Sequence, residues 1–586
     1  MNPRPTEKLF CTALRETLST RYSLGMLRSD LIAGLTVGLV AVPLAMALAI
    51  ASGVPPQYGL YTSIVAGLII AIAGGSRFNI SGPTAAFVVL LLPIVEKYGF
   101  GGLLLTTVLS GLMLVIMGIA RLGRLIQFIP YPVTLGFTAG IAVVIAVLQL
   151  KDLFGMTGNV SGEHFSEKVV ALLTAMPTAH MADLSIGLLT LAVLITWPRL
   201  KTLIPPHLVA LLVGSLAAAG AAWVVPDFSV ATIGSRFGYE LNGDVGSGIP
   251  PVAPHWVLPW TLPDANGQPV GLSFGLIREL LPSAFAVALL GAVESLLCAV
   301  VADGLTGSKH NPNGELIGQG LGNIAAPFFG GITATAAIAR TATNIRAGAQ
   351  SPVAAMIHAI TVLLAVVVFA PWLAYVPMAS LAALLMVVAW NMSEARHFAN
   401  VVRVAPRSDV VVLLVCFGLT VLFDMVLAVS VGVVLASVLF IKRMTEISDV
   451  RLVQREERPH ADLPREIAIY DLNGPLFFGA AEKAISVLSR VTAHVKVVIL
   501  DMADVPLLDM TGIVALDSII KKLNRQGVAL VLANLSPRLY RKLLQAGFRR
   551  ETGKLACTTS MAEAVAEASV MLRPPASSST NTSAPT

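Results

Sequence analysis

Long apolar segments fill residues 31–441 of this 586-residue chain and limit it to one class of fold. Fourteen such segments begin near residues 31, 58, 82, 101, 129, 183, 205, 280, 314, 333, 352, 376, 408 and 424. A helix needs about 20 apolar residues to cross a bilayer, and most of these segments reach that length. Only 13% of the residues are charged, against about 25% in soluble domains. The region is therefore predicted to be an all-α polytopic membrane domain.

The basic residues of the loops predict how these segments are oriented. If the segments alternate from a cytoplasmic N-terminus, the short outside loops near 54–57, 330, 372 and 424 carry no Lys or Arg. The loops that then fall inside do carry basic residues, which is the positive-inside pattern. Residues 1–30 are expected to be a cytoplasmic N-terminal segment without a cleavable signal peptide. The pattern predicts an even number of spans and cytoplasmic N- and C-termini.

Two short stretches interrupt the apolar pattern, NISGPTAAF from Asn79 and TATAAIARTATN from Thr333. Both are rich in small and hydroxyl-bearing residues, which does not suit a helix that faces lipid. Irregular backbone at membrane depth is tolerated only where it is buried in protein or lines a cavity. Each stretch is third in its half of seven segments. Because seven is odd, the second half must insert upside down, which predicts a 7+7 inverted repeat with the binding site at the interruptions.

The first interruption supplies the candidate site residues Ser81, Gly82, Pro83 and Thr84. Proline suits the first turn of a helix, so a helix is expected to begin here. Its free N–H groups and the positive end of its dipole would then face an anion. The alternative is a proline-containing helix start that only packs against its neighbours.

The second interruption is expected to form an opposing helix start from Thr333, Thr335, Ala336 and Ala337. Its hydroxyls can donate to an anion, and its small residues let the backbone approach. The alternative is small-residue packing in which the threonines bond back to their own helix. Arg340 follows in the same segment and is able to hold a carboxylate bidentately. In the alternative, its guanidinium reaches the membrane interface.

Glu294 is the only acid between Glu279 and Asp303 and lies deep in the eighth segment. A carboxyl group inside a membrane domain is a functional candidate by default. A proton on Glu294 would reduce the repulsion of an arriving dianion, so this residue is the candidate for coupling-ion binding. The alternative is a structural ion pair with Arg340.

The composition changes near residue 445, and a second domain is predicted after that point. Residues 442–464 are expected to be a linker, 465–572 a small α/β domain and 573–586 a disordered tail. Strands are expected at 467–474, 495–502 and 528–535, and helices at 480–495, 511–527 and 536–548, with Ser536 as an N-cap. Alternating strands and helices with short connections are typical of such a domain.

Several long motifs resemble the sulfate permease (SulP) family of anion transporters. They are GLTVGLVAVPLAMALAIASGVPPQYGLYT, GGSRFNISGPTAA, and GAVESLLCAVVADGLTG with NGELIGQGLGN. The C-terminal VPLLDMTGIVAL is similar to the core motif of STAS domains. Within the family, stretches such as GPTAAFVV and ITATAAIAR look closest to a bacterial C4-dicarboxylic acid transporter. The resemblance implies a core subdomain that moves against a gate subdomain, an anion held between half-helices three and ten, and a homodimer.

The resemblance also bears on single residues. Family members often place a basic residue at the position of Arg340, and an acid at the position of Glu294 can ligate Na⁺. Many members carry Gln or Glu after the proline that is Pro43 here, but this chain has Leu44, which shifts the coupling role to Glu294. Residues 45–48 would form an apolar wall beside the anion. Soluble STAS regulators are phosphorylated at the position of Thr511, although Asp509 and Thr511 could instead merely cap a helix.

The chain is therefore expected to be a secondary active transporter of the bacterial inner (plasma) membrane. The expected substrates are C4-dicarboxylates (succinate, fumarate, malate and aspartate), moved by proton symport with elevator-like alternating access. Alternatives are a sulfate or Na⁺-coupled bicarbonate transporter, an uncoupled channel, and a membrane-tethered STAS signalling or scaffold protein. Cytoplasmic protein partners through the STAS domain are expected.

Other function classes lack support in the sequence. No nucleophile–base pair, phosphate loop or metal cluster indicates an enzyme. The four cysteines (Cys11, Cys298, Cys416 and Cys557) have no metal-ligand spacing. No metal, cofactor or nucleic-acid partner is expected.

Overall fold

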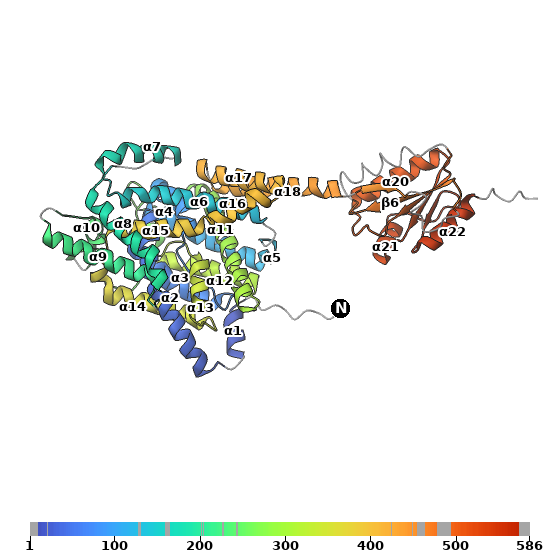
Figure 1. Ribbon diagram of the computed structural model, residues 1–586. Coiled ribbons are helices and arrows are strands. Elements are labelled where there is room, and N and C mark those ends of the chain that lie inside the picture. The colour runs from blue at the N-terminus through green and yellow to red at the C-terminus, as the bar shows by residue number, and fades with distance from the viewer. Residues whose placement is uncertain are drawn as a thin grey trace, which may run out of the picture. The chain divides into compact units, whose positions relative to one another are not determined.

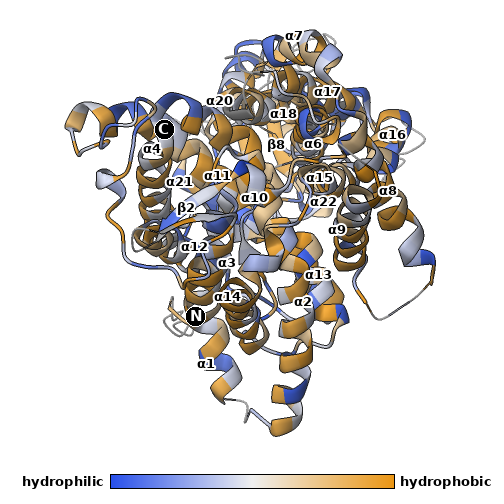
Figure 2. Cartoon of the chain, turned by 90° about the vertical axis from the view of Figure 1, so that its left-hand side faces the viewer, coloured by the Kyte–Doolittle hydropathy of each residue, from blue (hydrophilic) through white to orange (hydrophobic). Residues whose placement is uncertain are grey.

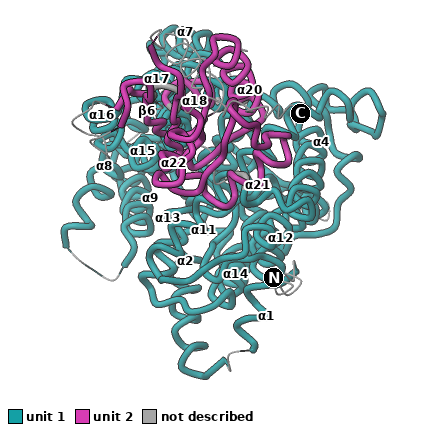
Figure 3. The backbone as a smooth tube through the Cα atoms, turned by 90° about the vertical axis from the view of Figure 1, so that its right-hand side faces the viewer, with its two compact units in different colours: residues 1–436 teal, residues 437–586 magenta. Residues whose placement is uncertain are grey.

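The computed structural model shows two compact units, residues 1–436 and 437–586, which are described separately (Figure 1, Figure 3). It describes residues 10–19, 22–126, 130–158, 165–200, 202, 204–225, 228–241, 244–423, 425–447, 449–453, 463–476 and 494–572. The expected tail at 573–586 and the helix expected at 480–495 lie outside the described residues, apart from His494 and Val495.

The first unit is built from helices that consist largely of hydrophobic residues (Figure 2). Nine helices in the described part of the chain are long and apolar enough to cross a membrane. The helices are α1 (Thr12–Ser19), α2 (Leu24–Ala51), α3 (Pro56–Ala73), α4 (Ala85–Ile119), α5 (Gly123–Ile126), α6 (Tyr131–Leu153), α7 (Phe165–Ala175), α8 (Met181–Thr196), α9 (Pro206–Val224), α10 (Ile233–Arg236), α11 (Phe274–Thr306), α12 (Pro312–Ala325), α13 (Ile338–Arg346), α14 (Val353–Leu373), α15 (Met378–Met392), α16 (Ala395–Val404), α17 (Arg407–Leu422) and α18 (Met425–Ile447), whose last residues belong to the second unit. The polytopic helical fold predicted from the sequence is confirmed.

The apolar segments predicted from the sequence fall on these helices, and most starts differ by a few residues. The larger differences are at α2, which begins at Leu24 inside the expected N-terminal segment 1–30, and at α11, which begins at Phe274 rather than near 280. The third and fourth segments share α4, which is interrupted at Gly99. Gly99 has φ 70° and ψ −172°, and a Cβ there would lie 2.2 Å from the carbonyl carbon of Asp264. Positive φ and close backbone contact both favour glycine. The break expected near residue 101 is therefore present.

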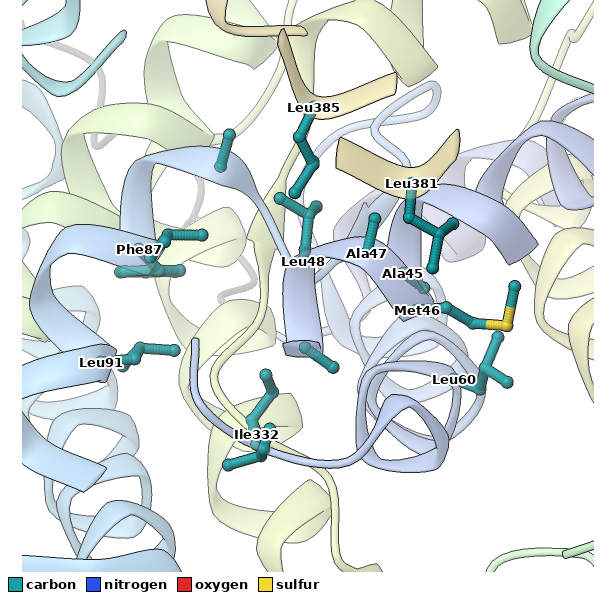
Figure 4. Packing of buried hydrophobic residues seen from close by; sticks show 14 of the residues in the cluster. Ala45, Met46, Ala47, Leu48, Leu60, Phe87, Leu91, Ile332, Leu381 and Leu385 are labelled. Carbon is teal, nitrogen blue, oxygen red and sulfur yellow. The ribbon is translucent and has the colours of Figure 1, made fainter. Parts of the chain in front are cut away.

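The helices of the first unit form two packing groups. We call α2, α3, α4, α11, α12, α13 and α14 the core helices, because they pack mainly on one another. We call α6, α8, α9, α15 and α17 the gate helices for the same reason. The groups meet where α2 contacts α15 and α9 and where α4 contacts α6. At the first contact Leu48 of α2 lies near Leu385 of α15 and Phe87 of α4, so residues 45–48 do form a buried apolar surface (Figure 4).

Two short strands lie among the core helices, β1 (Ser81–Gly82) and β4 (Thr335–Ala336). They pair in antiparallel fashion. An antiparallel pair is what two segments of opposite orientation would form, in agreement with an inverted repeat. A separate hairpin consists of β2 (Gly238–Leu241) and β3 (Asp244–Ser247).

The second unit is a small α/β fold around a five-stranded sheet. Its strands are β5 (Asp449–Leu452), β6 (Ile467–Asn473), β7 (Val497–Asp501), β8 (Ala529–Ala533) and β9 (Leu555–Cys557), in that spatial order. β5 is antiparallel to β6, and the other pairs are parallel. Its helices are α20 (Met510–Arg525), α21 (Pro537–Gln545) and α22 (Met561–Leu572).

The sequence interpretation of this unit is confirmed for β6, β7, β8, α20 and α21, and Ser536 caps α21 as expected. One boundary differs. The end of α18 and the strand β5 lie inside 442–464, which was expected to be a linker. β5 is charged because it is an edge strand that pairs on one side only, and such edges carry polar residues.

Candidate functional site

The two interruptions predicted to form the site lie side by side among the core helices. Ser81 pairs with Ala336 and Gly82 with Thr335 across the β1–β4 ladder. The ladder continues where the backbone N–H of Ala337 donates to the carbonyl oxygen of Ile80 at 3.0 Å. Residues separated by about 250 positions in the sequence therefore share one small piece of sheet.

A helix begins shortly after each strand, α4 at Ala85 and α13 at Ile338. The N-cap of α4 is Thr84 and that of α13 is Ala337, and neither start has a side-chain cap. The first N–H groups of a helix have no partner within it, so both starts offer donors and the positive ends of their dipoles. Together the two starts form a place where an anion would be stabilised.

The structure corrects the expected position of these helix starts. The residues around Pro83 were expected to form the first turn, but α4 begins only at Ala85, and Ser81 and Gly82 are extended. A residue that precedes proline is driven towards the extended conformation, which explains Gly82. In the second stretch Thr335 and Ala336 are likewise a strand rather than a helix start.

Arg340 is buried between the two helix starts, with 4% of its surface exposed. Its Nη2 donates to the carbonyl oxygen of Pro83 at 2.6 Å, while Nη1 has no hydrogen-bond partner among the described residues. Burial of this kind does not fit the alternative in which the guanidinium reaches the membrane interface. A buried cation with a free donor group is instead able to bind an anion.

The helix α11 contacts both starts through residues one turn apart. Thr84 Oγ1 donates to Glu294 Oε2 at 3.0 Å. Thr335 Oγ1 donates to the carbonyl oxygen of Gly291 at 3.1 Å. Within the described structure, Glu294 and Arg340 bond to the dipeptide 83–84 rather than forming the ion pair considered as an alternative. The candidate coupling residue is thus linked to the first helix start by one hydroxyl.

The remaining hydroxyl of the second stretch has a different role. Thr333 Oγ1 lies 2.9 Å from Thr107 Oγ1 in the second part of α4, and Thr333 is 1% exposed. This contact holds the chain in place before β4. It occupies the Thr333 hydroxyl, which was predicted to donate to an anion.

Sequence reasoning missed the polar residues of α12 that contact the strands. Glu315, Gln319 and Asn323 are all buried and lie four residues apart. Gln319 Nε2 donates to Ser81 Oγ at 3.0 Å, and Asn323 bonds to the backbone of Ala334. Their spacing of four was a usable signal, because it places three polar groups on one face of a helix.

Thr511 lies in the second unit, exposed, at the second residue of α20. Asp509 caps this helix, because its Oδ1 accepts a hydrogen bond from Gly512 N at 2.8 Å. The capping alternative is therefore confirmed for Asp509. Among the described residues no group of three or more His, Cys, Asp or Glu side chains is placed to hold a metal ion.

Comparison with known proteins identifies both units. The profile described as the Sulfate permease family matches residues 27–416, and the STAS domain profile matches residues 458–568. A putative sulfate transporter, YvdB of Bacillus subtilis (strain 168), is 40% identical over 91% of this chain and 96% of its own length. The bicarbonate transporter BicA of Picosynechococcus sp. is 28% identical over 85% of this chain and 86% of its own length.

Two solved structures share the fold. The murine Solute Carrier 26 family member A9 anion transporter, in the inward-facing state, matches with a TM-score of 0.81 at 20% identity, covering 96% of this chain and 94% of its own. The transmembrane domain of a cyanobacterial BicA matches with a TM-score of 0.58 at 26% identity, covering 71% of this chain and 99% of its own. The first likeness shows the fold alone. The relatives are described as a putative sulfate transporter, a bicarbonate transporter and an anion transporter, and none of these names refers to a C4-dicarboxylate.

Proposed function

The chain belongs to the sulfate permease family, and on that premise we propose that the paired starts of α4 and α13 bind the transported anion. As a member of this family the protein is a multi-pass membrane anion transporter. The observation that carries the proposal is the position of Arg340, buried between two uncapped helix starts with Nη1 free of other partners. One guanidinium and two helix dipoles together supply the positive potential that an anion needs.

The proposed substrates are C4-dicarboxylates: succinate, fumarate, malate and aspartate. The motifs GPTAAFVV and ITATAAIAR support this choice by their likeness to a C4-dicarboxylic acid transporter. The apolar surface of residues 45–48 would suit the CH₂ groups between two carboxylates. Sulfate is the second candidate, because a relative at 40% identity is described as a putative sulfate transporter. Bicarbonate with Na⁺ is the third, supported by the likeness to BicA.

Coupling is proposed to run through Glu294. The Thr84–Glu294 hydrogen bond connects this carboxyl group to the first helix start, next to the proposed anion. Proton symport is proposed, because a proton on Glu294 removes a negative charge near the site as the anion arrives. Na⁺ bound by the same carboxylate would achieve the same neutralisation.

The proposed movement is an elevator-like displacement of the core helices against the gate helices. All the site residues lie on core helices or on the strands between them, so the site can travel as one body. The smaller contact between the groups, largely apolar at α2 and α15, supports such a movement. A homodimer in a bacterial inner membrane, with cytoplasmic termini, is part of the proposal.

The STAS unit is proposed to regulate transport through cytoplasmic protein partners, with Thr511 as a phosphorylation site. Exposure of Thr511 at a helix N-terminus supports this, because a phosphate is electrostatically stabilised there. A membrane-tethered signalling protein is the alternative of another class. A chain truncated after α18 that still transports in liposomes would argue against signalling as the main role.

Uptake by the purified protein in liposomes tests the proposed function. Labelled succinate, sulfate and bicarbonate are compared while pH and Na⁺ gradients are varied independently. Accumulation of succinate driven by an inward proton gradient is expected, and Arg340→Gln should strongly reduce it at low succinate concentration while the protein still inserts. Uptake with unchanged affinity in Arg340→Gln would overturn the assignment of the site.

A further inference from the structure

The helix α12 carries a stripe of three polar residues that contacts both strands of the site. Glu315, Gln319 and Asn323 occur four residues apart, so they lie on successive turns of one face. Their exposed fractions are 1%, 1% and 0%. Three polar side chains buried in a membrane domain need partners, and each of the three finds them in the segments that precede or form β1 and β4.

Glu315 fixes the loop before β1. Its Oε2 accepts hydrogen bonds from the backbone N–H groups of Gly75 and Ser76 at 3.0 and 2.9 Å. Its Oε1 accepts from Asn79 Nδ2 at 2.8 Å and from Gln319 Nε2 at 3.2 Å. A carboxylate only accepts hydrogen bonds. The amide of Gln319 must therefore present its NH₂ group, since its oxygen would be repelled.

The orientation of Gln319 determines how Ser81 bonds. The NH₂ group uses one hydrogen on Glu315 and the other on Ser81 Oγ, at 3.0 Å. Ser81 Oγ is thus an acceptor in this contact, and its own hydrogen remains available. Among the described residues no acceptor for that hydrogen is present. The charge of Glu315 therefore determines which way the amide of Gln319 faces. Through that amide it makes the Ser81 hydroxyl oxygen a hydrogen-bond acceptor.

Asn323 holds the other strand. Its Nδ2 donates to the carbonyl oxygen of Ala334 at 2.8 Å, and its Oδ1 accepts from the N–H of the same residue at 2.7 Å. These two bonds imitate a neighbouring strand, directly before β4. The β1–β4 ladder has only two residue pairs, so it is too short to hold its register alone. The stripe of α12 therefore supports it along one side.

We propose that Glu315, Gln319 and Asn323 are positioning residues that set the spacing of the two helix starts and so determine which anions fit between them. The inference rests on the proposed function, because it concerns the same site. The three residues act through Ser81 and Ala334 and do not contact the anion. Loosening the stripe changes the discrimination between a compact anion and an elongated one more than it changes the turnover rate.

The test compares Gln319→Met with Asn313→Ala in the full-length protein. Met keeps the length of the side chain and removes both donors. Asn313 is a matched control, because it is a buried amide of α12 that bonds to Gly123 N at 3.1 Å and not to the strands. Glu315→Gln is the second variant, since it keeps size but allows the amide of Gln319 to reverse. It replaces Gln319→Met if that variant does not fold.

Two measurements are made. In hydrogen exchange of the detergent-solubilised protein, the amides of residues 80–86 and 334–341 should exchange at least about threefold faster in Gln319→Met, as expected for the loss of one buried hydrogen bond. Asn313→Ala should leave them unchanged. In liposomes, the ratio of apparent KM values for sulfate and succinate should change by at least about threefold, with the maximal rate preserved.

Failure of the positioning role and failure of the proposed function would give different results. If exchange at both strands matches the Asn313→Ala control, or if the KM ratio stays at its wild-type value, the positioning role is overturned. If the wild-type protein takes up neither anion, the proposed function fails instead. In that case the exchange measurement alone still decides whether α12 holds the two strands.

Discussion

Arg340 donates a hydrogen bond of 2.6 Å from Nη2 to the carbonyl oxygen of Pro83, so a cation of the second interrupted segment is anchored at the start of the first. The bond uses one side of the guanidinium and leaves Nη1 unpartnered among the described residues. This hydrogen bond therefore orients the guanidinium group of Arg340 but, because a carbonyl oxygen is neutral, does not neutralise its charge. An anion between α4 and α13 would complete the hydrogen bonding of this side chain.

Replacing Arg340 by Gln should weaken anion binding by about ten- to a hundredfold, the value of a hydrogen bond to a charged group. The variant keeps a donor for Pro83 but loses the charge. Binding of labelled succinate and sulfate to the purified protein measures the effect. Arg346→Gln is the control, because Arg346 is an exposed arginine of the same helix. Equal affinities in the two variants would contradict the prediction.

Gly82 should not tolerate a side chain. A Cβ there would lie 2.7 Å from Arg340 Nη1 and 2.9 Å from Ser63 Oγ. The added Cβ would displace Nη1 of Arg340 from the proposed anion site. Because Nη2 of the same guanidinium is bonded to Pro83, this displacement would also disturb that hydrogen bond. Gly82→Ala is expected to raise the apparent KM by about three- to tenfold, the cost of one disturbed hydrogen bond. Gly304→Ala, which meets open space, is the control in the same uptake assay; similar KM values for both would refute this account.

Glu294→Gln should uncouple uptake from the driving ion. Glutamine can still accept the hydrogen bond from Thr84, so the structure around α4 is preserved. It can neither take up a proton nor carry the charge that would hold Na⁺. Exchange of internal for external anion should persist, while accumulation in response to a pH or Na⁺ gradient is lost. Glu279→Gln, at an exposed acid of the same helix, should accumulate anion like the wild type; a Glu294→Gln protein that does so too would rule out the coupling role.

The sequence predicted the position of the site better than its form. Residues 79–84 and 333–337 stand out because small and hydroxyl-bearing residues interrupt apolar runs, and their juxtaposition follows from their matching places in the two halves. The strand pair was not predictable, because two residues carry no periodicity. Ser81 pairs with Ala336 and Gly82 with Thr335, so the strand pair depends on a contact between segments far apart in the sequence.

The polar stripe of α12 shows a different limit. Glu315, Gln319 and Asn323 are visible in NGELIGQGLGN, but nothing in the local pattern says what they face. A polar face usually indicates solvent, whereas here it meets buried backbone. The strand β5 was missed for a related reason, since a charged edge strand resembles a linker until its partner β6 is known.

The thiol of Cys557 in β9 should react slowly with alkylating reagents in the folded protein. Burial raises the pKa of Cys557 to about 11, against about 8.5 for an exposed cysteine. Labelling by iodoacetamide should therefore rise about tenfold per pH unit from pH 8 to 10, because the thiolate is the reactive form. The raised pKa means that the folded state favours the neutral thiol. The stability that this contributes is present below about pH 8.5 and falls as the pH rises towards 11.

Peptide mass spectrometry measures this labelling at Cys557 separately from the other cysteines. The same protein unfolded in denaturant is the control, and at pH 8 it should label faster than the folded protein. If Cys557 in the folded protein labels at pH 8 as fast as it does in the unfolded chain, its burial beside β8 is wrong.

The ion pair between Lys168 and Glu96 should influence the alternation between states. Lys168 Nζ lies 3.1 and 3.0 Å from the two carboxylate oxygens of Glu96, and 8% of the Lys168 side chain is exposed. Glu96 belongs to the core helix α4, whereas α7, which carries Lys168, packs on the gate helices α6 and α17. The pair therefore joins the two groups that are proposed to move. Movement of one group against the other has to break it.

Neutralising either partner, as in Lys168→Met or Glu96→Gln, should change the maximal transport rate by about twofold or more, while the affinity for the anion stays the same. Whether the maximal rate rises or falls tells whether the ion pair stabilises a state that slows the transport cycle or one that speeds it. Exchanging the charges with Glu96→Lys and Lys168→Glu together should restore the wild-type rate. Asp152→Asn breaks the Arg236–Asp152 pair, which joins α6 to the neighbouring α10, and should leave the rate unaffected. A charge-exchanged protein that behaves like the single variants would show that the pair has no part in the movement.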